Sequence, residues 1–160
     1  MTGNIMGEKT KGDEVLRKST GKKRKLHLTV RGVQTAFGQE DISEICVPGE
    51  YFRKGDVHYV FYSEHTEEGL VLKNRLTITP EKVELRKTGN GSSILLFRQG
   101  STESCRYQSP AGMLNLTSDT KKIKFRCGEQ DFHLTLKYSF YMTGLLMSDY
   151  HLTVRGIFRD

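Results

Sequence analysis

The hexapeptide His-Leu-Thr-Val-Arg-Gly occurs twice, at residues 27–32 and again at residues 151–156. Both copies alternate apolar and polar side chains, which is the pattern of a β-strand with one buried face. The first copy follows a polar N-terminal stretch, and the second lies close to the last residue. We therefore expect the two copies to be the first and last strands of a barrel. Paired with each other, they would leave the sheet without a free edge.

The sequence between the two copies keeps the same period of two and is interrupted at short intervals by turn residues. The clearest turns are at Pro48-Gly49, Lys54-Gly55-Asp56, Gly89-Asn90-Gly91 and Ser109-Pro110-Ala111-Gly112. The cleanest strand runs from Phe132 to Phe140, with its even-numbered apolar side chains predicted to face inward. A bulge is expected at Gly32, because the apolar residues change phase there.

The spacing of these strands sets the expected fold. We count about ten strands and no convincing helix, which favours an all-β protein with a single antiparallel, up-and-down barrel. The length of 160 residues suits one domain. No apolar segment is long enough for a membrane helix or resembles a signal peptide. The three cysteines are widely spaced and form no Cys-x-x-Cys pair, so we expect reduced, mostly buried thiols in a cytoplasmic protein.

Positive charge is concentrated before the first hexapeptide. Residues 1–25 hold eight Lys and Arg but only three Asp and Glu, whereas residues 26–160 are nearly neutral. We expect residues 1–25 to be a disordered basic tail and residues 26–160 to be the barrel domain. The block Lys22, Lys23, Arg24 and Lys25 is a candidate contact for RNA or an acidic protein. The alternative is a solvated tail without a specific partner.

An ordered set of short motifs resembles a known family. The set contains Gly49-Glu50-Tyr51, the strand Val57-His58-Tyr59-Val60-Phe61-Tyr62, Leu85-Arg86-Lys87-Thr88-Gly89, the Ser109–Gly112 turn and Leu134-Thr135-Leu136-Lys137-Tyr138. In this order it is similar to the DUF1934 family of uncharacterised, YwiB-like bacterial proteins. The resemblance implies a calycin-like barrel, the architecture of lipocalins, and it implies no catalytic residue. Ala111 departs from the family pattern, which has an aromatic residue at this turn.

The sequence offers little catalytic chemistry. Glu64 and His65 are adjacent on one strand and so are expected to point to opposite faces. His27 and His151 are predicted to face outward and to meet across the closing strand pair, but no third metal ligand is apparent. We therefore predict a protein that is not an enzyme and that has no metal site or cofactor.

The barrel interior is the main candidate for a binding site. Its aromatic residues can fill it completely, or it can hold one small apolar or amphipathic ligand. In the second case Asn74, Tyr107 and Tyr138 would orient the ligand, and Tyr59 and Phe61 would pack on it. The alternative function is an interaction module that uses the basic tail. No membrane contact is expected, and the oligomeric state is left open between a monomer and a homodimer.

Overall fold

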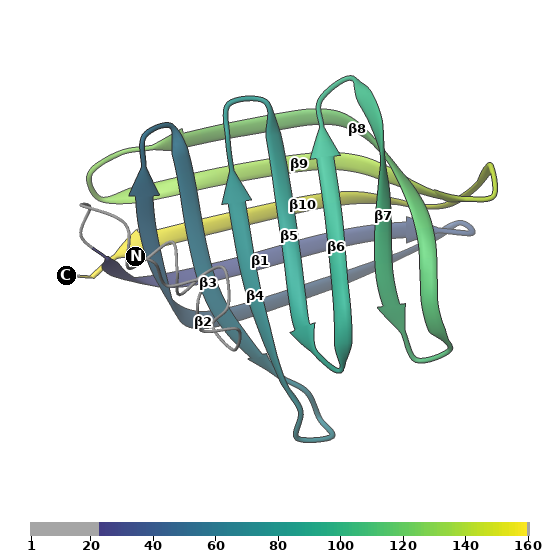
Figure 1. Cartoon of the computed structure of the whole chain (residues 1–160), viewed down its shortest axis with the longest axis horizontal. Coiled ribbons are helices and arrows are strands. Elements are labelled where there is room, and N and C mark those ends of the chain that lie inside the picture. The colour runs from purple at the N-terminus through teal and green to yellow at the C-terminus, as the bar shows by residue number, and fades with distance from the viewer. Residues whose placement is uncertain (1–22, 160) are drawn as a thin grey trace, which may run out of the picture.

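A computed structural model describes residues 23–159 as one closed barrel of antiparallel strands (Figure 1). The strands are β1 (Arg24–Ala36), β2 (Gln39–Lys54), β3 (Val57–His65), β4 (Val71–Ile78), β5 (Lys82–Gly89), β6 (Gly91–Arg98), β7 (Ser101–Ser109), β8 (Gly112–Cys127), β9 (Asp131–Met142) and β10 (Leu145–Phe158). Each strand pairs with the next along the chain, and β10 pairs with β1. The predicted ten-stranded up-and-down barrel is confirmed.

The barrel has two layers whose strands cross at a steep angle. Strands β3 to β7 run side by side in one layer, and β9, β10 and β1 run across them in the other (Figure 1). The long strands β2 and β8 bend from one layer into the other. Strand β2 continues through Pro48 and Gly49, so the strand end predicted at these residues is wrong. No helix in the described part of the chain is long and apolar enough to span a membrane.

The two hexapeptides close the barrel as expected. They pair antiparallel around Val30 and Val154, which are directly opposite each other. The same register places His27 opposite Ile157 and His151 opposite Val33, so the prediction that the two histidines meet is wrong. Pairing of β1 with β2 is continuous through Gly32, so the predicted bulge is also wrong. Register shifts occur instead in β8, between Thr120 and Lys122, and in β10, between Leu146 and Ser148.

Strand β9 provides the centre of the core. Its inward side chains, all buried, are Phe132, Leu134, Leu136, Tyr138 and Phe140. His133, Thr135 and Lys137 lie on the outer surface, as the alternation predicted, whereas Ser139 is buried and donates a hydrogen bond to Asp149. Because β9 lies between β8 and β10, its inward residues contact both neighbours and link the two ends of the chain.

Two places in the wall have fewer backbone pairs than the rest. Pairing of β2 with β3 stops at Gly49 and Tyr62, so β2 and β3 separate beyond these residues. Strands β6 and β7 share a single register pair, Ile94 with Arg106. Side chains supply the missing hydrogen bonds in this seam. The amide of Leu96 donates to Cys105 Sγ at 3.3 Å, and Ser118 Oγ donates to the carbonyl oxygen of Leu96 at 2.5 Å.

The stability of the β6–β7 seam is predicted to depend on the hydroxyl group of Ser118. Changing Ser118 to Ala removes a donor to the Leu96 carbonyl and should lower the free energy of unfolding by about 1–3 kcal/mol. The matched control is Thr117→Ala on the exposed face of the same strand, where the change should stay within about 1 kcal/mol. Urea denaturation measures both variants. Equal losses in the two variants would contradict a structural role for the Ser118 hydroxyl.

Candidate ligand-binding site

The middle of the barrel is filled by aromatic side chains. The ring of Phe97 lies 4.3 Å from that of Tyr138, and the ring of Tyr150 stacks on Tyr138 at 5.1 Å. Towards the other end, Phe132 lies between Tyr51, at 6.2 Å, and Phe125, at 6.0 Å. Of the two alternatives for the interior, these contacts favour a core packed by the protein's own side chains.

The inward polar residues gather at one end of the barrel. Asn74 is 3% exposed, and its amide group donates to Glu64 Oε2 at 2.8 Å. The ammonium group of Lys87 lies 3.1 Å from the same carboxylate oxygen. The amide oxygen of Asn74 is buried and has no hydrogen-bond partner. A buried acceptor without a donor is costly, so Asn74 is the inward residue best placed to bind a ligand.

The two tyrosines predicted to bind a ligand differ in exposure. Tyr138 is buried, whereas Tyr107 is 38% exposed. Burial raises the pKa of Tyr138, and the neighbouring Tyr150, Cys105, Tyr62 and Tyr107 add to the increase. The Tyr138 phenol therefore remains neutral at physiological pH, and Tyr107 lies near it.

The prediction that Tyr59 and Phe61 line the interior is wrong. In β3 the buried core residues are Val60 and Tyr62, which occupy the inward positions of the strand. Because side chains alternate along a strand, Tyr59 and Phe61 lie on the outer surface. Their rings stack there at a centroid distance of 6.5 Å.

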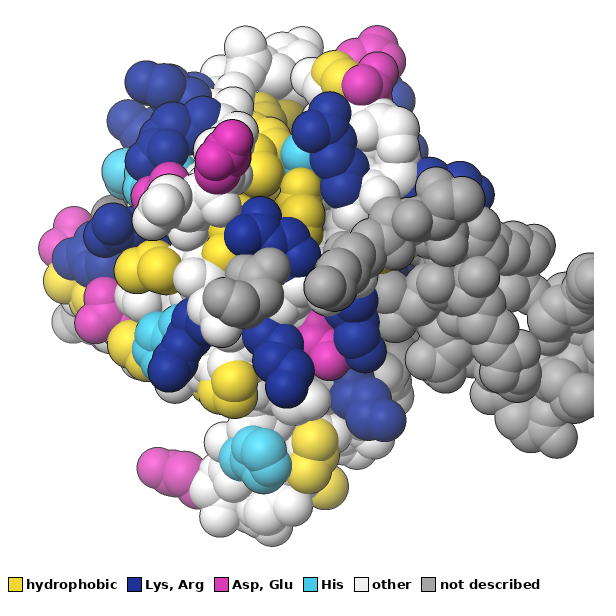
Figure 2. Space-filling view, turned by 90° about the vertical axis from the view of Figure 1, so that its left-hand side faces the viewer, with side chains coloured by type: hydrophobic (Ala, Val, Ile, Leu, Met, Phe, Trp, Pro, Cys, Tyr) yellow, Lys and Arg dark blue, Asp and Glu magenta, His cyan; other side chains and the backbone are white. Residues whose placement is uncertain are grey.

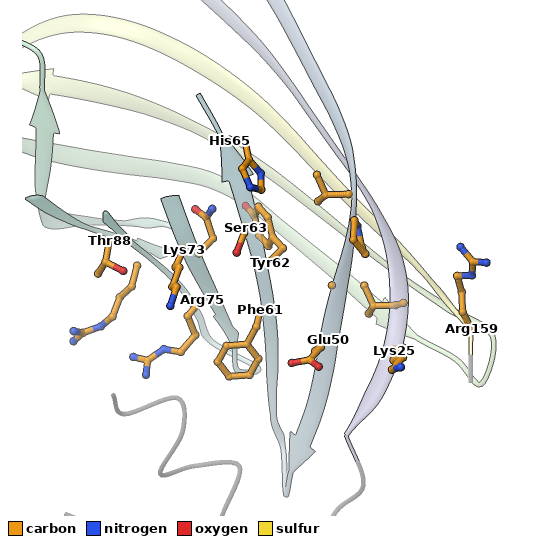
Figure 3. Close-up of a pocket in the computed structure, with 16 residues that line it drawn as sticks. Lys25, Glu50, Phe61, Tyr62, Ser63, His65, Lys73, Arg75, Thr88 and Arg159 are labelled. Atoms are coloured by element: carbon orange, nitrogen blue, oxygen red, sulfur yellow. The ribbon is translucent and has the colours of Figure 1, made fainter. Parts of the chain in front are cut away.

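Phe61 instead forms part of a large pocket on the outside of strands β1 to β5 (Figure 3). The pocket has a volume of about 1060 Å³ and includes Arg159 at one side. We call it the outer groove. Its outward-facing residues are Lys25, Pro48, Glu50, Phe61, Ser63, His65, Lys73, Arg75, Arg86 and Thr88.

The outer groove also reaches inward-facing residues. Tyr62 and Asn74, which are opposite each other in β3 and β4, are part of its lining. So is Val47, which lies in the part of β2 that no longer pairs with β3. The place where β2 and β3 separate therefore connects the groove with the polar end of the interior.

Strand register aligns the charged side chains of the groove. Glu50, Phe61, Arg75 and Arg86 occupy successive opposite positions on β2, β3, β4 and β5. Lys73, Arg75 and Phe61 point to the same side of the sheet (Figure 3). Lys and Arg side chains also surround an apolar patch on the barrel end near the C-terminus (Figure 2).

The electrostatics of the groove centre on Arg75 and Arg86. The two residues are directly opposite each other, and like charges in this position repel. They share one carboxylate, Glu84, which lies 3.7 Å from Arg75 and 2.5 Å from Arg86. Burial lowers the pKa of Arg75, Arg86 lowers it further, and Glu84 acts in the opposite direction. The Nε of Arg75 is buried without a partner. One carboxylate thus serves two guanidinium groups.

Comparison with known proteins shows which family the chain belongs to. The model of the family described as "Domain of unknown function (DUF1934)" matches residues 28–154. The chain belongs to the DUF1934 family. The family predicted from the sequence motifs is thus confirmed.

The structure of this DUF1934 chain is similar to the crystal structure of the ywiB protein from Bacillus subtilis. The TM-score is 0.79 and the sequence identity is 19%, and the match covers 90% of this chain and 99% of the other. At this identity the likeness shows a common fold and nothing more. Among curated proteins, no match was found.

The basic block of the DUF1934 chain only partly lies within the described residues. Lys22 is outside them. Lys23 lies 3.1 Å from Glu50, and Arg24 begins β1 with its guanidinium 3.8 Å from the ring centre of Phe158. Lys25 lines the outer groove. Arg24 and Lys25 therefore belong to the barrel wall, and the predicted domain boundary at residue 26 comes two residues after the start of β1.

Glu64 and His65, the adjacent pair considered for acid–base chemistry, do not lie together in the structure. Glu64 faces inward, with Asn74 and Lys87, whereas His65 is exposed and lines the outer groove. Within residues 23–159 no three His, Cys, Asp or Glu side chains are placed to hold a metal ion. All three cysteines are free, but Cys46 and Cys127 are exposed, so the prediction of mostly buried thiols is wrong.

Sequence reasoning missed Arg75 and Arg86 as candidate site residues. The available signal was their place on strands that pair through the Thr79–Lys82 turn, which sets them in register. Two arginines opposite each other on one face of a hairpin were predictable from that turn. Their shared carboxylate and the pocket beside them required the three-dimensional structure.

Proposed function

We propose that this DUF1934 protein is a non-enzymatic binding protein for a small amphipathic anion that occupies the outer groove. The observation that carries the proposal is the Arg75–Arg86 pair, in which two opposed guanidinium groups share the single carboxylate of Glu84. A carboxylate, sulfonate or phosphate group bound beside Arg75 would give its buried Nε a partner and reduce the repulsion from Arg86.

The rest of the groove suits the apolar part of such a ligand. Phe61 offers a ring on the outer surface, one position across the sheet from Arg75. Asn74 offers a buried amide oxygen without a donor at the inner limit of the groove. A pocket of about 1060 Å³ is large enough for a ligand of drug size. The proposal therefore keeps Asn74 and Phe61 from the sequence-based site and moves the site from the interior to the outer groove.

The charge of the groove favours an anion. Among its described lining residues are Lys25, Lys73, Arg75, Arg86 and Arg159, against the single carboxylate of Glu50. Glu50 is itself paired with Lys23. A role without catalysis or cofactor and a location in the bacterial cytoplasm remain part of the proposal. The three free cysteines are consistent with a reducing compartment.

The test compares an anionic and a neutral fluorescent probe of similar shape. We expect 8-anilinonaphthalene-1-sulfonate to bind more tightly than N-phenyl-1-naphthylamine, which lacks the sulfonate. Replacing Arg75 by Gln should weaken binding of the sulfonate about 10- to 100-fold, since a charged hydrogen bond contributes about 1.5–3 kcal/mol. Binding of the neutral probe should change little. Fluorescence titration measures both dissociation constants.

The control is Arg106→Gln, because Arg106 lies in the same outer row but beyond the groove. It should leave the affinity for both probes unchanged. Arg86→Gln provides a second variant in case Arg75→Gln fails to fold, which circular dichroism would reveal. Equal affinity for the two probes in the wild-type protein, or equal losses in Arg86→Gln and Arg106→Gln, would contradict the proposal.

A further inference from the structure

The layer of the barrel that lies across from the outer groove has a second charged surface. It is made by the outward side chains of β8, β9, β10 and β1, which run together in one layer (Figure 1). We call it the basic face and define it by its basic side chains, which are Arg31, Lys122, Lys124, Arg126, His133, Lys137, His151 and Arg155. None of these residues lines the outer groove.

Strand register brings basic residues of the basic face directly opposite each other. Lys137 of β9 has Lys122 of β8 on one side and His151 of β10 on the other. In the next row but one, His133 lies between Arg126 and Arg155. The ammonium groups of Lys122 and Lys137 are like charges in opposite positions, which repel each other and weaken a sheet. This pair therefore works against stability and favours a negatively charged partner.

The acidic residues of the described chain leave much of this charge unpaired. Asp131 lies 3.2 Å from Arg126 and 3.9 Å from Arg155, and the bond from Arg126 is the main reason why the pKa of Asp131 is lowered. Lys122 and Lys137 have no ion pair with any residue in 23–159. Two acidic residues, Asp119 and Asp149, lie beyond the row of Lys122 and Lys137 and limit the basic face at that end.

The cationic side chains of the basic face also affect the pKa of His151. Burial lowers it first, and Lys137, Arg31 and Lys122 then lower it further. No acidic side chain contributes to the shift in the opposite direction. His151 is therefore neutral at physiological pH and can act as a hydrogen-bond donor or acceptor within a field set by its cationic neighbours.

The dimensions and chemistry of the basic face indicate the kind of partner. Four strands and three rows of outward side chains cover a patch of about 14 Å by 14 Å. A nucleic-acid duplex carries about eight negative charges over 14 Å of its axis. Between the basic residues lie the hydroxyl groups of Thr29, Thr135 and Thr153, which can also bond to phosphate oxygens.

The lack of Phe, Tyr and Trp side chains on the basic face narrows the choice of partner further. The three rows contain no Phe, Tyr or Trp, so they provide no platform for stacked bases of a single strand. Val33 is their only aliphatic residue, and a membrane surface is normally bound with the help of several inserted apolar side chains. A nucleic-acid duplex exposes its phosphates and keeps its bases inside. A duplex is therefore the partner whose chemistry complements the basic face.

We propose that the basic face binds double-stranded nucleic acid through its phosphates, without reading the base sequence. The proposal does not depend on the outer groove, which shares only strand β1 with the basic face and contains none of the same side chains. Lys122 and Lys137 are its central residues, because they are exposed, opposite each other and without an acidic partner among the described residues.

The test measures binding of fluorescein-labelled DNA and RNA duplexes to the full chain by anisotropy, over a range of salt concentrations. Both duplexes should bind, and affinity should fall as salt rises. In the double variant Lys122→Gln/Lys137→Gln, the salt dependence should lose about 0.9 per phosphate contact, or about 2 in total. At about 0.1 M salt this corresponds to an affinity roughly 50-fold lower.

Two double variants of equal charge provide the controls. Lys54→Gln/Lys82→Gln removes two charges from β2 and β5, and Lys18→Gln/Lys22→Gln removes two from the N-terminal stretch. Both should reduce affinity less than about fivefold, as expected for a change in net charge alone. A loss in either control as large as in Lys122→Gln/Lys137→Gln would overturn the proposal. So would binding to anionic phospholipid vesicles but not to duplexes, or no binding of duplexes at all.

Discussion

Replacing Phe132 by Ala is expected to lower the free energy of unfolding by about 3–5 kcal/mol, a large part of the stability of a typical domain. Phe132 is 0% exposed and packs against Tyr51, Phe125 and Phe158, which come from three other strands. The cavity left by its ring would separate side chains on both sides of the closing β10–β1 pair. Urea denaturation measures the loss.

The matched control for Phe132→Ala is Phe37→Ala in the turn between β1 and β2. Phe37 is 89% exposed, so removing its ring should change stability by less than about 0.5 kcal/mol. Similar losses in the two variants would contradict the position of Phe132 in the core.

Gly156 is the reason why a ring of this size fits. A Cβ at Gly156 would overlap the Phe132 ring and would lie 2.9 Å from its Cδ2 atom. Gly156→Ala alone should cost about 1–3 kcal/mol by overpacking. Combined with Phe132→Leu, the loss should be at least 0.5 kcal/mol smaller than the sum of the two single losses. Additive losses would show that the two positions are not in contact.

Leu136 and its neighbour Thr135 provide the second large expected effect. Leu136 is 0% exposed in the middle of β9, and Leu136→Ala should cost about 2–5 kcal/mol. Thr135 is on the outer surface of the same strand, so Thr135→Ala should cost less than about 1 kcal/mol. A register shift by one residue would exchange the two positions. Comparing their unfolding midpoints in urea therefore tests the register, and a larger loss for Thr135→Ala would contradict it.

The fold could be predicted from local patterns because apolar and polar residues alternate along most strands of the barrel. From Phe132 to Phe140 in β9 the apolar residues alternate with polar ones, and the repeated hexapeptides indicated which strands close the barrel. The turn at Gly89-Asn90-Gly91 joins β5 and β6 as expected, with both glycines at positive φ. Patterns of this kind depend on neighbouring residues alone, so a sequence is enough to read them.

The site was harder to predict because it depends on residues that break the pattern. Strand β3 is apolar on both faces, so periodicity cannot decide whether Phe61 or Tyr62 points inward. Pairing with β2 and β4 settles the choice in favour of Tyr62. The phase change after Gly32 was interpreted as a bulge, whereas β1 stays regular and places the half-buried Val33 on its outer surface.

The two charged surfaces illustrate a further limit. Lys122 and Lys137 are 15 positions apart in the sequence, and their opposite positions depend on a register shift in β8 between Thr120 and Lys122. Nothing in the local sequence specifies such a shift by one residue. Arg75 and Arg86 were closer to being predictable, since a single turn separates them, but the groove around them is formed by five strands.

The location of a bound amphipathic anion is the most direct test of the proposed function. Nuclear magnetic resonance of the protein with 8-anilinonaphthalene-1-sulfonate can record intermolecular Overhauser effects between the probe and aromatic side chains. We predict effects from the probe to the ring protons of Phe61, on the outer surface beside Arg75. Effects to Phe97 and Tyr138 instead would place the ligand in the barrel interior and would contradict binding in the outer groove.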